Sequence, residues 1–430
     1  MRFVAQALGD GAWTREAIAD RLSRTLGDAP VDLARLSARL LFHFDSQLPP
    51  APRDLTRFLS RESLLRPFLD NEHAQPLIIT DPPVMGRPPD SLPALALPKI
   101  PTLKDLQIWL GLFPTELEWF ADERRRQSKV TIPALHHYRY AWVRKASGDG
   151  RLIEKPKERL KSMQKQLLSE ILARIPPHPR AHGFVRGRSI RSYVADHIGQ
   201  PAVMRFDLKN FFTSVPVPRI CRLFQTLGYP PRVASLITGL CTHEVSPALA
   251  GAPFADLPWK TRKQLTSPHL PQGAPTSPAL ANLSAWAMDC RLTGLAARFD
   301  LRYSRYADDL AFSGGAELRR LAPQLESLVG AIALEEGFAL NHRKTRLRLA
   351  SQRQKLAGVV VNACPNIPRS DYERLKATLH NCVRFGPASQ NRRGHENFRS
   401  HLLGRIAHVG WLNPNRGKKL RQILEKIDWN

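Results

Sequence analysis

The sequence predicts an α+β protein in which a mixed central region lies between two helical ends. Apolar residues recur at helical spacing through residues 1–70 and again from Arg369 onward. Between these ends, three short segments rich in aromatic and aliphatic residues are expected to form strands, at 138–143, 203–207 and 303–314. Helices and strands segregated in this way are typical of the α+β class.

The stretch Tyr303–Gly314, YSRYADDLAFSG, holds two adjacent carboxylates, Asp308 and Asp309. The flanking aromatic and aliphatic residues suit half-buried strands, and Ala307-Asp308-Asp309 suits a tight turn. We expect a β-hairpin that presents both acids in a cleft. Carboxylates held this close repel each other, so a positive group must face them, and a metal cation is the simplest choice. An ordinary acidic turn is the alternative.

The net charge of +26 is unevenly distributed along the 430 residues. Residues 1–100 carry 12 basic and 12 acidic side chains, so this region is neutral. The remaining 330 residues hold 52 basic and 26 acidic side chains, and they include the acidic hairpin. A basic surface of this size implies a polyanionic partner, with nucleic acid as the leading candidate.

The five cysteines form no Cys-x-x-Cys unit. They are expected to be reduced thiols, which suits a cytoplasmic protein. No apolar run reaches the length of a membrane span, so we expect no membrane partner.

Local signals predict the remaining elements. Eight prolines between residues 76 and 101 exclude regular structure, so 71–101 is expected to be an extended linker. Thr102, with Asp105 three residues later, is expected to cap a helix. A basic-tipped hairpin is expected from Tyr138 to Glu154. Further helices are expected over 15–26, 33–44, 114–126, 157–175, 316–336, 369–384 and 396–411.

Three segments carry residues suited to nucleotides. Val203–Asp207 is a strand that ends in a carboxylate just before Phe211-Phe212. Leu270–Leu283, LPQGAPTSPALANL, is a Gly/Pro loop that leads into a helix, whose N-terminus favours an anion. The segment HGFVRGRSI (182–190) combines glycines, which allow close backbone approach, with arginines, which bind phosphate bidentately. It ends a stretch, 151–190, with ten basic and three acidic side chains, for which a solvated face is the alternative.

Three carboxylates on strand ends, a Gln-Gly loop, a downstream lysine and a basic cleft fit one type of reaction. Two Mg²⁺ ions about 4 Å apart would activate a hydroxyl nucleophile and stabilise a leaving pyrophosphate. Hard cations of this kind prefer carboxylate oxygen. The carboxylates are Asp207, Asp308 and Asp309, and the lysine is Lys344.

In this order the segments resemble the palm of a reverse transcriptase, over a region from about Thr102 to residue 430. FDLKNFF, LPQGAPTSP, YADD and GFALNHRKT resemble the first four palm motifs, and LAGVVVN resembles the primer-grip hairpin. HGFVRGRSI and the ending HLLGRIAHVGWLNPNRGKKL narrow the resemblance to bacterial retron-type enzymes. Within these, the likeness is closest to the myxobacterial branch, which carries an N-terminal extension.

Two elements depart from that family's pattern. Of its Asn-Ala-x-x-His element only the histidine is matched, by His197, and Leu356-Ala357-Gly358 stands where Val-Thr-Gly is usual. In the family both elements are tied to recognition of its own structured RNA.

The resemblance implies a role for each matching residue. Asp207 and Asp308 would bind the metal ions with Asp309 as a supporting carboxylate, and Lys344 would donate a proton to the leaving pyrophosphate. Phe212 would exclude a 2′-hydroxyl and so select dNTPs. The other implied contacts are with the triphosphate at Lys145 and Arg151, with the templating pair or incoming nucleotide at Gln272 and Gly273, and with RNA at Arg186, Arg188 and His197.

The implied fold is a right-hand polymerase with fingers, a ferredoxin-like palm and a helical thumb, plus a small helical N-terminal region. The expected bounds are 1–70 for the N-terminal region, 71–101 for the linker, 102–202 for the fingers, 203–364 for the palm with its primer-grip hairpin, and 365–430 for the thumb. No RNase H-like domain is expected after the thumb, so removal of the RNA template would need another protein.

The implied function is RNA-templated DNA synthesis with dNTPs and Mg²⁺ in antiphage defence. A dedicated structured noncoding RNA would serve as template and primer, and an effector protein would be a further partner. Two alternatives stay open. One is another defence-associated reverse transcriptase that makes no branched RNA–DNA product, and the other is a catalytically silent RNA-binding scaffold. The intact set of three acids disfavours the scaffold.

Overall fold

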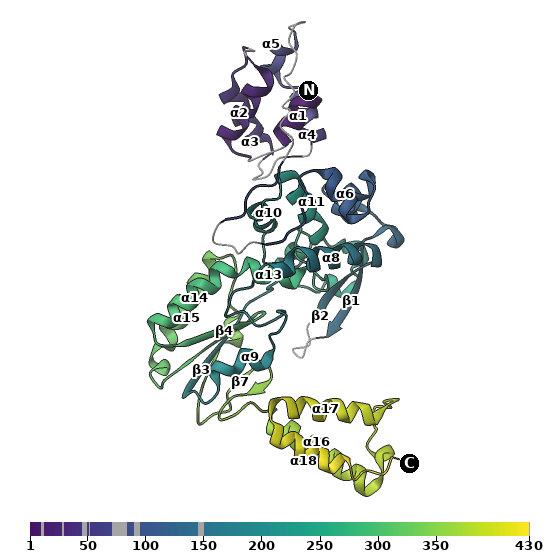
Figure 1. Cartoon of the computed structure of the whole chain (residues 1–430), viewed down its shortest axis with the longest axis vertical. Coiled ribbons are helices and arrows are strands. Elements are labelled where there is room, and N and C mark those ends of the chain that lie inside the picture. Colours follow the sequence, from purple (N-terminus) through teal and green to yellow (C-terminus); the bar gives the residue numbers. More distant parts are fainter. Residues whose placement is uncertain are drawn as a thin grey trace. The chain divides into compact units, whose positions relative to one another are not determined.

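The computed structural model describes residues 1–9, 13–27, 30–44, 50, 52–70, 84–89, 95–144 and 150–429. The chain folds into two compact units, whose elements are labelled in Figure 1. Unit 1 comprises Met1–Pro176 and Phe212–Ser284, and unit 2 comprises Pro177–Phe211 and Ala285–Asn430. The predicted domain bounds do not coincide with these units and stay predictions. No helix within the described ranges is long and apolar enough to cross a membrane.

Unit 1 begins with short helices. They are α1 (Arg2–Gly9), α2 (Arg15–Leu26), α3 (Leu33–Phe44), α4 (Pro52–Leu59) and α5 (Arg66–Leu69). Their apolar faces pack together, and Leu22, Leu36 and Leu55 are fully buried. The helices predicted over 15–26 and 33–44 are confirmed. Most of the predicted linker lies outside the described residues, and its described parts, 84–89 and 95–101, contain no helix or strand.

The next two helices differ in how well their ends were predicted. α6 (Leu103–Leu110) begins with the expected capping box between Thr102 and Asp105. α7 (Pro114–Ala121) ends five residues before the predicted end at 126. Asp122 stops it by adopting a left-handed conformation with φ of 47°, and its carboxylate accepts hydrogen bonds from the backbone of Arg126 and Gln127.

The strand pairing of the predicted hairpin is confirmed, whereas its predicted basic tip lies outside the described residues. β1 (Tyr138–Arg144) pairs antiparallel with β2 (Gly150–Pro156), while residues 145–149 between them lie outside the described residues. α8 (Glu158–Glu170) is shorter than the predicted helix over 157–175, because the chain tightens into a 3₁₀ turn at Leu172–Arg174. The remaining helices of unit 1 are α10 (Val217–Thr226), α11 (Pro231–Cys241), α12 (Trp259–Leu265) and α13 (Ser277–Ser284).

Unit 2 is built on a four-stranded antiparallel sheet. Its strands are β3 (Ala202–Asp207), β4 (Arg302–Tyr306), β5 (Asp309–Gly314) and β6 (Arg346–Leu349), in the spatial order β4-β5-β3-β6. This is the order of a ferredoxin-like sheet, as predicted. β6 was not predicted, although its sequence, RLRL, alternates as a strand does.

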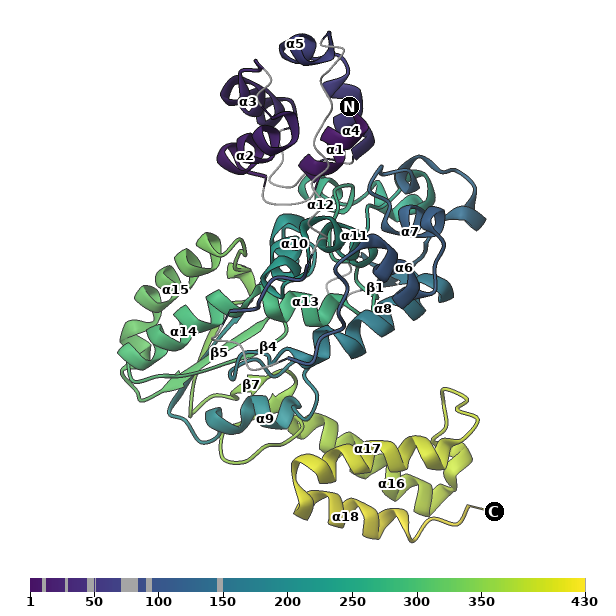
Figure 2. The same cartoon turned by 45° about the horizontal axis from the view of Figure 1, so that its top comes forward.

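The two faces of this sheet are covered differently. Helices α14 (Trp286–Arg298) and α15 (Leu318–Glu335) lie side by side on one face, as Figure 2 shows. The opposite face packs against α9 (Ile190–Val194) and the hairpin of β7 (Lys355–Leu356) and β8 (Val359–Val360). Because side chains alternate along a strand, each sheet residue points either towards α14 and α15 or towards α9 and the β7–β8 hairpin.

The last part of unit 2 is helical, as predicted. α16 (Arg369–Phe385), α17 (Phe398–Leu412) and α18 (Pro414–Leu424) bury a shared apolar core. The hairpin that precedes them was predicted from LAGVVVN. It turns at Ala357-Gly358, where both residues have positive φ, 43° and 94°, as tight two-residue hairpins require.

Candidate active site

The acidic hairpin turns where the sequence predicts. Tyr306 of β4 pairs with Asp309 of β5, so Ala307 and Asp308 form the turn, with Ala307 at a φ of 55°. Gly183 lies against this turn, because a Cβ added there would meet the Ala307 nitrogen at 2.5 Å. The close approach that this glycine allows is therefore to the hairpin itself, which any larger residue at 183 would displace.

Strand register brings the predicted carboxylates together at one end of the sheet. Asp207, the last residue of β3, is the cross-strand partner of Asp309. The backbone nitrogen of Leu208 donates to the carbonyl of Asp308 at 2.9 Å, so the turn stays close to β3. Asp207 and Asp309 are 4% and 9% exposed. Two poorly solvated acids thus lie at one end of the sheet, next to the half-buried Asp308.

Asp309 is held by an arginine that the sequence analysis missed. Arg205 Nε donates to Asp309 Oδ1 at 2.8 Å, and a second guanidinium nitrogen contacts the same oxygen. Burial nevertheless raises the pKa of Asp309 to about 6, against the opposing effect of Arg205 and with further increase from Asp308 and Asp207. A signal for Arg205 existed, since it precedes Asp207 by two residues and so lies on the same face of β3.

Asp207 is held by the predicted lysine. Lys344 Nζ donates to both carboxylate oxygens, at 2.9 and 3.0 Å, from the 3₁₀ turn His342–Lys344. Asn341 anchors the same turn, because its backbone nitrogen donates to the Asp207 carbonyl at 2.7 Å and its side chain reaches Asp207 Oδ2 at 3.3 Å. Lys344, 137 residues away in sequence, is thus brought to the carboxylate of Asp207.

The donor chemistry of this site suits a hard divalent cation, since all three side chains offer carboxylate oxygen. The geometry does not yet enclose one. Among the described residues, no three His, Cys, Asp or Glu side chains are arranged to hold a metal ion. Lys344 and Arg205 instead neutralise Asp207 and Asp309. A bound cation would replace the Lys344 ammonium as the charge that faces Asp207.

A buried ion pair supports the hairpin from its other face. Arg305 and Asp289 of α14 are both fully buried and joined through two guanidinium nitrogens, at 2.8 and 2.6 Å. The Tyr303 hydroxyl donates to the same Asp289 carboxylate at 2.7 Å. Removing one partner of such an ion pair leaves a buried charge unpaired, which lowers the free energy of unfolding by about 3–5 kcal/mol.

Three of the predicted nucleotide residues of unit 1, Arg151, Gln272 and Gly273, lie on or against β2. Glu154, fully buried on β2, accepts from the Gln272 backbone nitrogen at 3.2 Å, and its own nitrogen donates to the Gln272 carbonyl at 2.8 Å. Gly273 is needed here, because a Cβ would meet the Glu154 carbonyl at 2.6 Å and its φ is 134°. Arg151 is exposed on the same strand. Phe212 is half-buried in unit 1, and Lys145 lies outside the described residues.

Glu154 itself was not predicted as a site residue. His269 Nε2 lies 3.1 and 3.2 Å from its two carboxylate oxygens. Burial disfavours the charged imidazole, but the Glu154 carboxylate outweighs it, so the pKa of His269 is raised. Through its hydrogen bonds with the Gln272 backbone, Glu154 positions the Gln272 loop on β2. No local pattern marks it, because its partners are more than a hundred residues away.

The three predicted RNA contacts have different surroundings. Arg186 is exposed. Arg188 makes hydrogen bonds within the protein. Its guanidinium donates to the carbonyls of His178 and Pro179 at 2.8 and 3.1 Å, and also to that of Ala181. His197 is fully buried, so the prediction that it touches RNA is wrong for this fold. Its two ring nitrogens lie 2.6 and 2.7 Å from the hydroxyls of Ser313 and Ser304.

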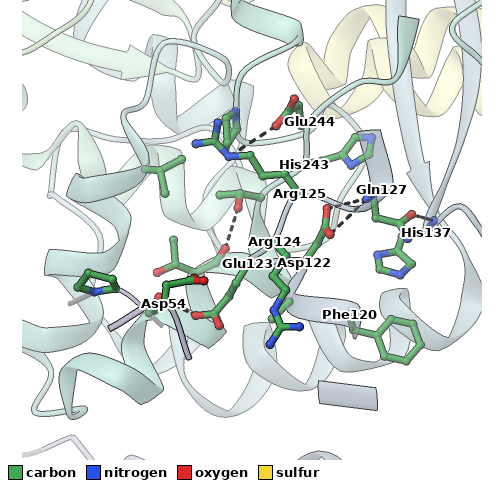
Figure 3. Close-up of a pocket in the computed structure, with 18 of the residues that line it drawn as sticks. Asp54, Phe120, Asp122, Glu123, Arg124, Arg125, Gln127, His137, His243 and Glu244 are labelled. Carbon is green, nitrogen blue, oxygen red and sulfur yellow. Dashed lines mark hydrogen bonds and ion pairs between the residues drawn. The ribbon is translucent and has the colours of Figure 1, made fainter. Parts of the chain in front are cut away.

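Unit 1 also contains a cavity of about 770 Å³, shown in Figure 3. None of the predicted site residues lines it. Two of its acids have partners already: Glu123 forms a two-point ion pair with Arg232, and Asp122 caps the 126–127 backbone. Burial raises the pKa of Asp122 to about 6. The predicted site therefore lies elsewhere than this cavity.

A ferredoxin-like sheet that carries paired aspartates at a strand end is the arrangement expected of a template-directed nucleotide polymerase. The family model described as "Reverse transcriptase (RNA-dependent DNA polymerase)" matches residues 143–361, about half of the chain. The chain belongs to the reverse transcriptases and, within them, to the retron type, and it is an RNA-directed DNA polymerase.

Three curated relatives illustrate this membership. The retron Mx65 reverse transcriptase of Myxococcus xanthus is 37% identical over 75% of this chain and 71% of the relative. The retron Mx162 enzyme of the same organism is 32% identical over 74% and 65%. The retron Ec86 enzyme of Escherichia coli is 30% identical over 68% and 81%. The likeness to myxobacterial enzymes agrees with the expectation from sequence.

Proposed function

We propose that this reverse transcriptase copies a dedicated structured noncoding RNA into DNA, with that RNA as both template and primer. The observation that carries the chemistry is the pairing of Asp207 with Asp309 across β3 and β5, with Lys344 on the Asp207 carboxylate. The retron type supports the dedicated RNA, and the 52 basic against 26 acidic side chains after residue 100 support a large polyanionic partner.

The proposed reaction joins the primer's terminal hydroxyl oxygen to the α-phosphorus of a dNTP and breaks the bond to pyrophosphate. Asp207 and Asp308 would hold two Mg²⁺ ions, with Asp309 as a supporting carboxylate that Arg205 orients. When bound, the ions supply charge for deprotonating the hydroxyl and for stabilising the leaving pyrophosphate. Lys344 would give the departing pyrophosphate its proton, since its ammonium already lies at the carboxylates.

The nucleotide would be selected by residues of unit 1. Arg151 and Lys145 would pair with the triphosphate, and Gln272-Gly273 would contact the templating pair or incoming nucleotide. Phe212 would exclude the 2′-hydroxyl. The support for this part is the anchoring of Gln272 on β2 through buried Glu154, which holds the loop beside the strand that carries Arg151.

The same proposal assigns domain names and a biological role. Residues 102–202 would act as fingers, 203–364 as palm and 365–430 as thumb. The retron type favours a role in antiphage defence with an effector protein, in the cytoplasm. Arg186 would contact RNA phosphates, whereas Arg188 would hold the 178–181 backbone that supports the hairpin.

Sequencing the nucleic acid that co-purifies with the protein tests this proposal. We expect one abundant structured RNA, joined to or accompanied by DNA complementary to part of it. Treatment with dNTPs should lengthen that DNA, and omission of divalent metal should prevent the extension. Recovery of only heterogeneous cellular RNA, with no complementary DNA, would contradict a dedicated template.

A further inference from the structure

Trp259 of unit 1 is exposed, although no role predicted from the sequence uses it. It begins α12, and 67% of its surface is exposed. Lys263, one turn later, places its Nζ 5.1 Å from the centroid of the indole ring. Lys260, Arg262 and Lys263 give this short helix three cations and no acid. An exposed large aromatic ring among cations is the surface composition that single-stranded nucleic acids bind.

A cavity of about 600 Å³ lies beside the ring, within the range of ligand sites, roughly 300–1,000 Å³. Trp259, Arg262 and Lys263 line it together with Phe254, which is only 6% exposed. Arg262 and Lys263 give the cavity lining two cations, whose charge complements that of a phosphate.

The cavity rests on a fixed base. Phe254 and Leu265 pack with Leu152 of β2 in one apolar cluster. Trp142 of β1 donates its indole nitrogen to the Ala250 carbonyl at 2.7 Å. The segment is therefore attached to the β1–β2 hairpin, the element that also carries the exposed Arg151. A stacking surface on a fixed base loses little conformational entropy when it binds.

We infer that Trp259 and this cavity bind an unpaired nucleotide of single-stranded nucleic acid. The base stacks on the indole, and Arg262 and Lys263 pair with the adjoining phosphate. The inference rests on the proposed function, because an enzyme that copies RNA must hold unpaired template. A protein partner is the less favoured occupant, because the ring's neighbours on α12 are cations and not an apolar patch.

Fluorescence anisotropy with the full chain and a labelled single-stranded oligouridylate tests the site. Trp259→Ala should weaken binding about 5- to 100-fold, the loss expected for one stacked base. Trp259→Phe should restore most of it, because a ring is retained. Lys263→Met should lower the slope of log affinity against log salt by about one phosphate contact, whereas Trp259→Ala should leave the slope unchanged.

Two controls make the result specific. Phe113→Ala removes another exposed aromatic ring of unit 1, one beside Glu116, and should not change binding. Blunt duplex RNA should bind the Trp259→Ala variant as it binds the parent. Equal binding of the oligouridylate by parent and Trp259→Ala would overturn the inference and leave this face to a protein partner. Equal losses for duplex and single strand would overturn it too.

The titration separates this inference from the proposed function. A parent that binds the oligouridylate through Trp259 but extends no primer would refute the proposed reaction and keep the site. If the parent extends primers and the Trp259→Ala variant binds the oligouridylate normally, the Trp259 site is refuted and the proposed reaction is kept. A photoreactive 5-iodouridine oligonucleotide should, in addition, crosslink to the peptide that contains Trp259.

Discussion

Lys344 Nζ lies 2.9 and 3.0 Å from the two carboxylate oxygens of Asp207, across 137 residues of sequence. The lysine that is proposed to protonate pyrophosphate is thus bound to a proposed metal ligand. The Lys344 side chain is 56% exposed, whereas the Asp207 side chain is 5% exposed. The lysine therefore reaches from the surface to a buried carboxylate. If Asp207 holds a cation as proposed, the cation would face the carboxylate in place of the ammonium, and Lys344 would be able to contact the substrate.

Lys344→Ala should slow single-turnover incorporation about 10²-fold or more, because it removes a general acid. Lys344→Arg keeps the positive charge, but a guanidinium does not release a proton in proteins. We therefore expect the arginine variant to keep parental thermal stability without recovering the rate. A parental rate in Lys344→Ala would exclude the proton-donor role.

Asp308→Asn and Asp207→Asn should each lower dNTP incorporation by about 10³-fold or more, since loss of a metal ligand removes several kcal/mol of transition-state stabilisation. RNA affinity should remain near that of the parent, because no basic contact is lost. Asp256→Asn, at an exposed acid of unit 1, is the matched control and should remain active. Substantial polymerisation by either active-site variant would refute the metal assignment.

Phe212→Ala should improve the use of rNTPs relative to dNTPs by about 10- to 100-fold, the range that one steric contact in a pocket provides. The comparison of kcat/KM for both sugars measures it. Phe211→Leu is the control, because Phe211 is buried and stacks on Phe338 with 5.6 Å between the ring centroids. Its loss should reduce stability without changing the choice between rNTPs and dNTPs. If the parent already uses rNTPs as well as dNTPs, Phe212 is not a gate.

His197 should make the fold sensitive to acid. Burial lowers its pKa to about 4, below the ordinary value of 6.5. Between these two pKa values the unfolded chain binds more protons than the folded chain. The contribution of the neutral His197 to the free energy of unfolding is therefore fully present above pH 6.5 and is lost as the pH falls towards 4. The contribution is on the order of 3 kcal/mol.

His197→Gln tests this in thermal melts. The variant should be less stable than the parent at pH 7.5, because the hydroxyls of Ser304 and Ser313 lose their partner, and the difference should narrow at pH 5. Part of the acid sensitivity should persist, since burial also lowers the pKa values of His137 and His182 to about 4. A constant difference across this range would show that His197 does not titrate as described.

Arg186→Ala and Arg188→Ala should differ in kind. Arg186 is exposed, so its loss should lower the salt slope of RNA binding by about one contact at unchanged stability. Arg188 holds the carbonyls of His178, Pro179 and Ala181, so its loss should lower the melting temperature instead. Salt titrations and melts of the two variants, side by side, separate these outcomes. Identical behaviour of the two would contradict the distinction.

The sequence by itself determined the local elements and the order of the motifs. The capping box at Thr102, the hairpin turning at Ala307-Asp308 and the hairpin turning at Ala357-Gly358 follow from short-range chemistry. Such signals extend over a few residues, because capping, turn conformation and side-chain alternation depend only on neighbours in the chain. Helix ends were less predictable, since Asp122 stops α7 through its own backbone conformation.

Only the tertiary structure decided which distant groups meet. Arg205 reaches Asp309, Glu154 holds Gln272, and His197 is buried against hydroxyls of two paired strands. Each of these contacts joins residues more than a hundred positions apart and depends on strand register and burial. No local pattern encodes them, because a shift of one residue in register would turn every side chain of a strand to the other face.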